Sequence, residues 1–227
     1  MPVVRHGTDL LPGPGRRRRM MSDADAVSFL AVSREVFAPL YPYYAARFLA
    51  DWGRDHGRCL DIGCGGGDLG LAVLGQSACR CVLVDRAPVM VRAAREHAAL
   101  VGLADRVTVL AGDVHALPLG DGCIDLVVSR GSLMFWEDLP RAFAELYRVL
   151  APGGLAVCGG GLGPPEIREG ICREMALRDA RWRNGVPAPR PGTDPDRHAG
   201  ALRAAGIPDW DITREDTGHW IVLRKPV

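Results

Sequence analysis

The chain has 227 residues, of which 48% are hydrophobic, and its formal net charge is +1. This length suits one globular domain with a sizeable core, and the near-neutral charge gives no electrostatic argument for a nucleic-acid partner. No apolar run approaches the roughly 18 residues of a membrane helix. The seven cysteines form no CxxC pair, so we expect reduced thiols of a cytoplasmic protein, with no metal site and no membrane partner.

Residues 1–21 are predicted to form a flexible basic tail. A Pro-Gly repeat precedes the four consecutive arginines Arg16–Arg19, and no apolar segment of a secretion signal follows them. A basic arm for nucleic acid is the other interpretation of this run. Met20 and Met21 also offer alternative translation starts.

Residues 22–56 are predicted to form an N-terminal helical cap. Apolar residues recur at helical spacing over Ala24–Leu40, and a second helix is predicted over Ala45–Trp52. Proline breaks the pattern between them, within the aromatic segment Tyr41–Tyr44. Because this cap precedes the glycine-rich turn described next, it could fold over a ligand bound there.

The stretch Asp61–Gly70 is the centre of the chain's organisation. An apolar run ends in an acid, a glycine cluster follows, and then an apolar helical segment, which predicts strand, tight turn and helix. Gly65-x-Gly67-x-x-Gly70 matches the dinucleotide pattern, but Asp68 would repel a pyrophosphate. S-adenosylmethionine has no phosphate, and its ammonium suits carboxylates, so it is the favoured ligand over a nicotinamide dinucleotide.

Strands and helices alternate along the rest of the core. Further strands are predicted at 79–85, 106–113, 123–129 and 155–158, and helices at 89–100, 139–150, 166–182 and 194–205. This alternation predicts an α/β fold with a doubly wound, mostly parallel, seven-stranded Rossmann-like sheet. Two segments around Thr217-Gly218 predict an antiparallel β-hairpin at its C-terminal end.

Acids end three successive predicted strands, at Asp61, Asp85 and Asp113. In parallel sheets, ligands bind beyond the carboxyl ends of the strands, so these acids are expected to share one site. The core is expected over residues 57–227, with a lid-like insertion at about 159–195 that its glycine run could hinge.

The order of these motifs resembles the class I S-adenosylmethionine-dependent methyltransferases, in the small-molecule branch with a methyltransferase-11-like core. The resemblance is close over residues 57–158. Five segments carry it: Leu60–Gly67, Val82–Asp85, Gly112–Val114, Leu117–Val127 and Leu146–Gly154.

The resemblance implies S-adenosylmethionine as cofactor and a role for each motif residue. Asp85 would bind both ribose hydroxyls, and Asp113 would accept from the adenine amino group. The glycine turn would hold the methionine end, with Asp61 supporting its ammonium. The expected cofactor-binding residues are Asp61, Gly63, Cys64, Gly65, Asp85, Arg86, Asp113, Val114 and Arg130, of which Arg86 would stack on adenine and Arg130 would contribute its backbone.

Methyl transfer from a sulfonium is an in-line displacement, in which positioning supplies much of the acceleration. A catalytic residue is therefore not required, and none is assigned. His115, His219 and Glu137 are candidate general bases. The expected substrate-pocket residues are Tyr43, Tyr44, Phe135, Trp136 and Met175.

The leading hypothesis is S-adenosylmethionine-dependent methyl transfer to a small-molecule acceptor in specialised metabolism. One alternative is a non-catalytic partner of another enzyme that binds S-adenosylmethionine or a nucleoside. Another is a nucleic-acid methyltransferase that uses the arginine-rich tail, although nucleic acid is disfavoured as a partner. The acceptor atom, and the choice between monomer and homodimer, stay open from the sequence.

Overall fold

The computed structural model describes residues 22–179, 182 and 194–227. The predicted basic tail, and residues 180–181 and 183–193 of the predicted lid-like insertion, lie outside the described residues.

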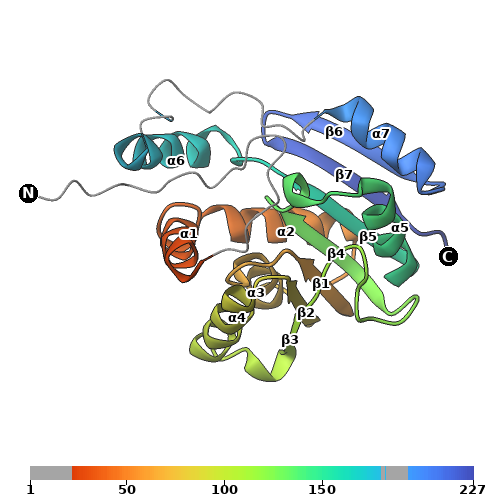
Figure 1. Ribbon diagram of the computed structural model, residues 1–227, viewed down its shortest axis with the longest axis horizontal. Helices are drawn as coiled ribbons and strands as arrows, with labels where there is room; N and C mark the ends of the chain where they lie inside the picture. Colours follow the sequence, from red (N-terminus) through yellow and green to blue (C-terminus); the bar gives the residue numbers. More distant parts are fainter. Residues whose placement is uncertain (1–21, 180–181, 183–193) are drawn as a thin grey trace, which may run out of the picture.

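One seven-stranded sheet forms the centre of the molecule, in the order β3-β2-β1-β4-β5-β7-β6 (Figure 1). The strands are β1 (Arg58–Ile62), β2 (Arg80–Asp85), β3 (Val107–Ala111), β4 (Ile124–Arg130), β5 (Leu150–Gly160), β6 (Trp210–Glu215) and β7 (Gly218–Arg224). The first five pair in parallel, whereas β7 runs antiparallel to both β5 and β6. The predicted fold class and the C-terminal hairpin are therefore confirmed, and the strand order reverses between β1 and β4.

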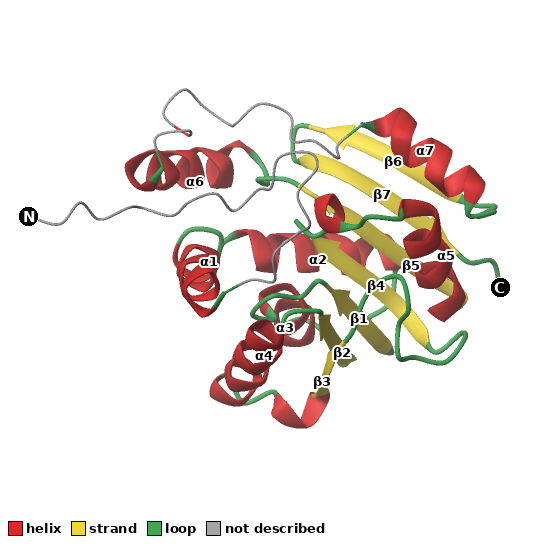
Figure 2. Cartoon of the chain, viewed as in Figure 1, coloured by secondary structure: helices red, strands yellow, loops and turns green. Residues whose placement is uncertain are grey.

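Helices cover both faces of this sheet (Figure 2). The α-helices are α1 (Asp23–Glu35), α2 (Leu40–Trp52), α3 (Asp68–Gly75), α4 (Pro88–Leu100), α5 (Leu139–Val149), α6 (Pro165–Arg178) and α7 (Pro195–Ala204). Short 3-10 turns are η1 (Ala104–Arg106) and η2 (Leu133–Phe135). None of these described helices is both long and apolar enough to cross a membrane.

A hydrophobic core on each face of the sheet follows from the alternation of side chains along the strands. Leu83 and Val128 pack with α2, α3 and α4 on one face. Their neighbours Val84 and Val127 pack with α5 and α7 on the other. Since both faces are buried, the strands are apolar throughout, as the sequence pattern indicated.

The cap differs from the expected arrangement at its aromatic segment. Tyr41–Tyr44 forms the first turns of α2, which begins at Leu40. Pro42 is accommodated there because the first N–H groups of a helix have no partner within it. The aromatic segment is thus helical rather than a break between helices.

Strand β5 also begins earlier than expected. It starts at Leu150, which pairs with Ile124, and an irregularity in register precedes the regular pairing from Leu126 and Leu155 onward. Pro152 and Gly153 lie within this irregular part. They stop helix α5, as expected, without preventing the start of the strand.

Candidate cofactor and acceptor site

The glycine turn joins β1 to α3 at the point where the strand order reverses. Gly63, Gly65 and Gly67 have φ values of 67°, 54° and 81°, which favour glycine. A Cβ on Gly67 would lie 2.9 Å from Leu83 Cδ1, and one on Gly63 would overlap Ser132. Glycine is therefore required on this turn both by backbone conformation and by close packing.

Two of the three strand-end acids hold backbone amides of this turn. Asp61 is buried and accepts from the Gly70 amide at 2.9 Å, and burial raises its pKa to about 7. Asp85 accepts from the amides of Gly65 and Ala87, both at 2.9 Å. Burial also raises the pKa of Asp85. A nearby positive charge on a ligand would favour the ionised form of both carboxyls.

The third acid, Asp113, lies in an exposed position after β3. It accepts from the His115 amide at 2.9 Å and pairs with the His115 ring. Partial burial acts to raise its pKa, but these hydrogen bonds outweigh it and the net shift is downward. The adjacent Val114 is buried, and Arg86 is exposed.

A cavity of about 510 Å³ opens over the carboxyl ends of the central strands. Asp61, Gly63, Cys64 and Gly65 line one end of it. The β6–β7 hairpin lines the other end, through Arg214, Glu215, Gly218 and His219, and Trp182 also contributes. The structure thus brings the methionine-end residues of the prediction together, whereas Asp85, Arg86, Asp113 and Val114 are not in the lining of this cavity.

Helix α1 covers the glycine turn and supplies Phe29 and Ser33 to the cavity. Ser33 Oγ donates to Asp68 Oδ2 at 3.0 Å and also hydrogen-bonds the Tyr41 hydroxyl. Arg34 of α1 lies 3.9 Å from the same carboxylate. Asp68, which the sequence marked only as unfavourable for a pyrophosphate, therefore ties the cap to the turn. Nothing in the spacing of Ser33 signalled this contact.

Arg130 ends β4 and extends its side chain into an aromatic surrounding. Its Cζ lies 5.3 Å, 5.8 Å and 5.9 Å from the ring centres of Phe37, Tyr41 and Tyr44. Its Nη2 donates to the Gly161 carbonyl at 2.9 Å. Burial lowers the pKa of this guanidinium. The sequence suggested only a backbone role here, but Arg130 lines the cavity and its side chain contacts the aromatic rings.

The three candidate bases occupy different places. His219 lines the cavity, and its Nε2 lies 3.0 Å from Nδ1 of the buried His198 on α7. Burial lowers the pKa of His219. His115 instead accepts from the Asp138 amide at 3.2 Å through Nε2, away from this cavity.

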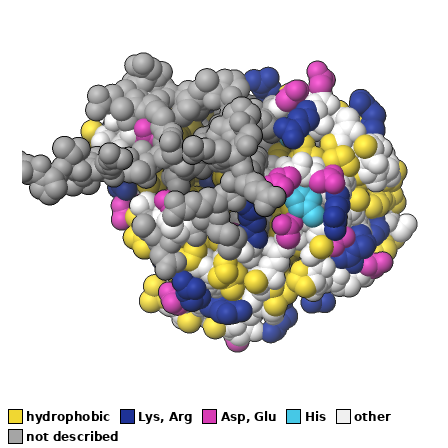
Figure 3. All heavy atoms as spheres, viewed as in Figure 1, with side chains coloured by type: hydrophobic (Ala, Val, Ile, Leu, Met, Phe, Trp, Pro, Cys, Tyr) yellow, Lys and Arg dark blue, Asp and Glu magenta, His cyan; other side chains and the backbone are white. Residues whose placement is uncertain are grey.

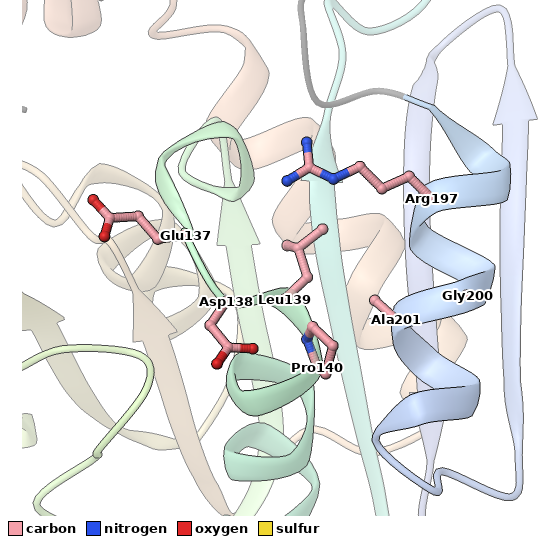
Figure 4. Close-up of a pocket in the computed structure, with 7 residues that line it drawn as sticks. All are labelled: Glu137, Asp138, Leu139, Pro140, Arg197, Gly200 and Ala201. Atoms are coloured by element: carbon pink, nitrogen blue, oxygen red, sulfur yellow. The ribbon is translucent and has the colours of Figure 1, made fainter. Parts of the chain in front are cut away.

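Glu137 lies in a separate hollow of about 380 Å³ between the start of α5 and α7 (Figure 4). Arg197 extends over this hollow from α7, whereas the Glu137 carboxylate points away from it (Figure 4). The predicted cofactor residues are not part of this lining. Glu137 and the glycine turn therefore belong to different cavities.

The expected substrate residues do not line the larger cavity. Tyr44 is fully buried against Phe48 and Trp220, and Trp136 packs on Phe143 on the opposite face of the sheet. The remaining members of that set, also outside the lining, are Tyr43, Phe135 and Met175. Their neighbours Tyr41 and Met134 line it instead. The helical path of Tyr41–Tyr44 and the turn η2 decide which neighbour faces inward, and neither was predicted.

Comparisons with known proteins agree with this geometry. The family model described as "Methyltransferase domain" matches residues 60–158. A solved structure of a proposed S-adenosyl-L-methionine-dependent methyltransferase from Methanococcus maripaludis is 34% identical, covering 95% of this chain and 98% of that chain with a TM-score of 0.85.

Curated relatives match over shorter stretches. A malonyl-[acyl-carrier protein] O-methyltransferase from Methylococcus capsulatus is 40% identical over 98 residues, which are 43% of this chain and 34% of the relative. A demethylmenaquinone methyltransferase from Thermus thermophilus is 41% identical over 101 residues, 44% of this chain and 45% of the relative. The matches thus span between a third and a half of these relatives.

Proposed function

The chain belongs to the class I S-adenosylmethionine-dependent methyltransferases, and from this premise we propose that it methylates a small molecule of specialised metabolism. The observation that carries the proposal is the cavity of about 510 Å³ that the glycine turn and His219 both line. A volume of this size suits a small ligand. A small acceptor also agrees with the relative that is named for demethylmenaquinone.

The residues present fit S-adenosylmethionine as the donor. Asp61 and Asp85 are carboxyls whose ionisation is disfavoured by burial, so a ligand with an ammonium and a sulfonium would relieve that cost. Asp61 and the Gly63–Gly65 backbone would hold the methionine end. Asp85 would hold the ribose hydroxyls, and Asp113 with Val114 the adenine.

When bound, S-adenosylmethionine supplies an electrophilic methyl group. The chain's own contribution is to position the acceptor and to exclude water, with α1 as the cover over the glycine turn. For an acceptor that must lose a proton, we assign His219 as general base. Its lowered pKa keeps the ring neutral near pH 7, and His198 Nδ1, 3.0 Å from Nε2, orients the ring.

Incubation of the full chain with methyl-labelled S-adenosylmethionine and a panel of small acceptors tests this proposal. The panel contains hydroquinones, carboxylic acids, amines and thiols, and the readouts are labelled product and S-adenosylhomocysteine. Transfer to at least one class is expected. Tight donor binding with no transfer to any class would instead support the non-catalytic alternative.

The nucleic-acid alternative is tested by removing residues 1–20. The described part of the face in Figure 3 carries acidic and basic side chains intermixed, which gives no field of one sign for a phosphate backbone. Donor binding and transfer to the small acceptor are expected to survive this deletion. Loss of transfer, with gain of activity on RNA or DNA by the full chain, would reverse the assignment.

A further inference from the structure

Arg130 is a half-buried cation with no carboxylate paired to it among the residues that the structure describes. Its Nε is inaccessible to solvent and has no hydrogen-bond partner among the described residues. Within that same part of the chain, the Gly161 carbonyl is the acceptor that its guanidinium reaches, and no carboxylate forms an ion pair with it. Removing a charge from water is costly unless the charge is paired.

The aromatic groups around Arg130 orient it without satisfying its donors. Phe37, Tyr41 and Tyr44 present ring faces to the guanidinium, which attract it but provide weak acceptors. The two tyrosine hydroxyls are engaged elsewhere. The Tyr41 hydroxyl meets Ser33, and the Tyr44 hydroxyl donates to the Thr217 carbonyl at 2.5 Å.

The nearest acids of the glycine turn have partners of their own. Asp61 is held by the Gly70 amide. Asp68 is held by Ser33 and faces Arg34 and His97. Neither is therefore the resident counter-ion of Arg130.

Arg130 stands between the two ends of the cavity. The glycine turn lies on one side of it and the hairpin residue His219 on the other, and all of them line the same space. The neighbouring positions Gly131 and Gly160 carry no side chain, and a Cβ on Gly160 would meet no atom closer than 3.8 Å. These two positions therefore place no side chain in the cavity beside Arg130, which is itself half-buried.

We infer that Arg130 anchors a carboxylate of the methyl acceptor, so that the acceptor is an organic acid whose carboxylate pairs with the guanidinium while His219 faces the reacting part. A planar guanidinium with unused N–H groups matches a carboxylate in a bidentate pair. This inference rests on the proposed function.

Calorimetric titration of the full chain, saturated with S-adenosylhomocysteine, tests the inference. The probes are two matched pairs, benzoate with benzamide and hexanoate with hexanamide. The wild-type chain should bind at least one acid about 10-fold or more tightly than its amide, and Arg130→Met should remove this preference. The inference would be overturned if neither acid bound the wild-type chain at about 10 mM. It would also be overturned if Arg130→Met preferred the acid as strongly as wild type does.

Arg173→Met is the matched control, since Arg173 is an exposed arginine of α6 that does not line this cavity. This control variant should keep the preference for the acid. If it lost that preference while Arg130→Met kept it, the inference would be contradicted. Arg130→Lys keeps the charge but loses the bidentate geometry. Arg130→Lys should prefer the acid less than wild type does and more than Arg130→Met does, and it can be measured even if Arg130→Met folds poorly. An acid preference equal to that of wild type would count against a bidentate guanidinium–carboxylate pair.

A second arm separates the acceptor from the donor, which also has a carboxylate. S-adenosylmethionine and its decarboxylated analogue are titrated into wild type, Arg130→Met and Arg130→Lys. The substitutions should change both affinities by the same factor. Selective weakening of S-adenosylmethionine would show that Arg130 pairs with the donor and would overturn the inference. Absence of donor binding by the wild-type chain would contradict the proposed function itself.

Discussion

At the scale of single residues, the site depends on carboxyl groups whose pKa is raised by burial. Asp61 and Asp85 lie at the ends of neighbouring strands and each accepts a backbone N–H near the glycine turn. Their position at strand ends was predictable, because parallel strands bring their carboxyl ends to one edge. The raised pKa values were not, because they depend on burial in the folded chain.

Asp85→Ala should weaken S-adenosylmethionine binding by about 100-fold or more, since it removes a charge-assisted contact to two hydroxyls. Isothermal titration calorimetry measures the effect. Asp105→Ala, an exposed acid in η1, is the control and should bind as wild type does. Binding by Asp85→Ala within about 3-fold of wild type would refute the assigned role.

Asp61 should make stability decline with pH. Its folded pKa of about 7 lies above the usual range of an unfolded aspartate, so the folded state binds the extra proton between about pH 4 and pH 7. Its contribution to the free energy of unfolding is fully present below about pH 4 and is lost, by a few kcal/mol, as the pH rises to about 7.

Urea unfolding of wild type and Asp61→Asn across this range checks the decline. Asparagine can still accept from the Gly70 amide but has no proton to lose, so the variant should gain stability relative to wild type as the pH rises. Parallel pH profiles for the two proteins would show that Asp61 titrates normally.

His219→Asn should lower kcat by about 100-fold for an acceptor that must be deprotonated, as general-base loss does, with donor affinity unchanged. Wild-type kcat should fall as the pH drops through the lowered pKa of His219, and the variant should lack this limb. His198→Asn, a positioning variant, should shift the limb. His115→Asn is the control, because His115 does not line the cavity. If this variant lost as much kcat as His219→Asn does, the choice of His219 as the base would be contradicted.

At the scale of elements, local signals predicted the strands and most helices, because apolar runs and Gly or Pro breakers are local features. Two boundaries depended on tertiary contacts. Tyr41–Tyr44 became helical as α2 packed on the sheet, and β5 started at Leu150 because that residue pairs with Ile124. Neither partner is visible from the sequence nearby.

The contact between α1 and the glycine turn is the element-level link with a direct test. Ser33→Ala should leave the Asp68 carboxylate short of one donor and cost about 1–2 kcal/mol of stability. It should also increase hydrogen exchange of the α1 amides. Ser28→Ala, at an exposed position on the same helix, should change neither, and equal exchange in both variants would argue against this link.

At the scale of the whole molecule, the sequence was sufficient for the topology, and its assignment of the donor end of the site stays a prediction. The sequence was insufficient for the acceptor end. His198 and His219 meet from a helix and a strand 21 positions apart, and Arg130 is enclosed by three rings of the cap. These contacts depend on how the elements pack, so no residue spacing in the sequence predicts them.

The most direct test of the central claim is calorimetric titration of the full chain with S-adenosylmethionine. Saturable binding at one site per chain is predicted, with a Kd between about 1 µM and 1 mM. If no heat of binding were measured at donor concentrations up to several millimolar, the assignment of the glycine turn and its cavity as the donor site would be contradicted.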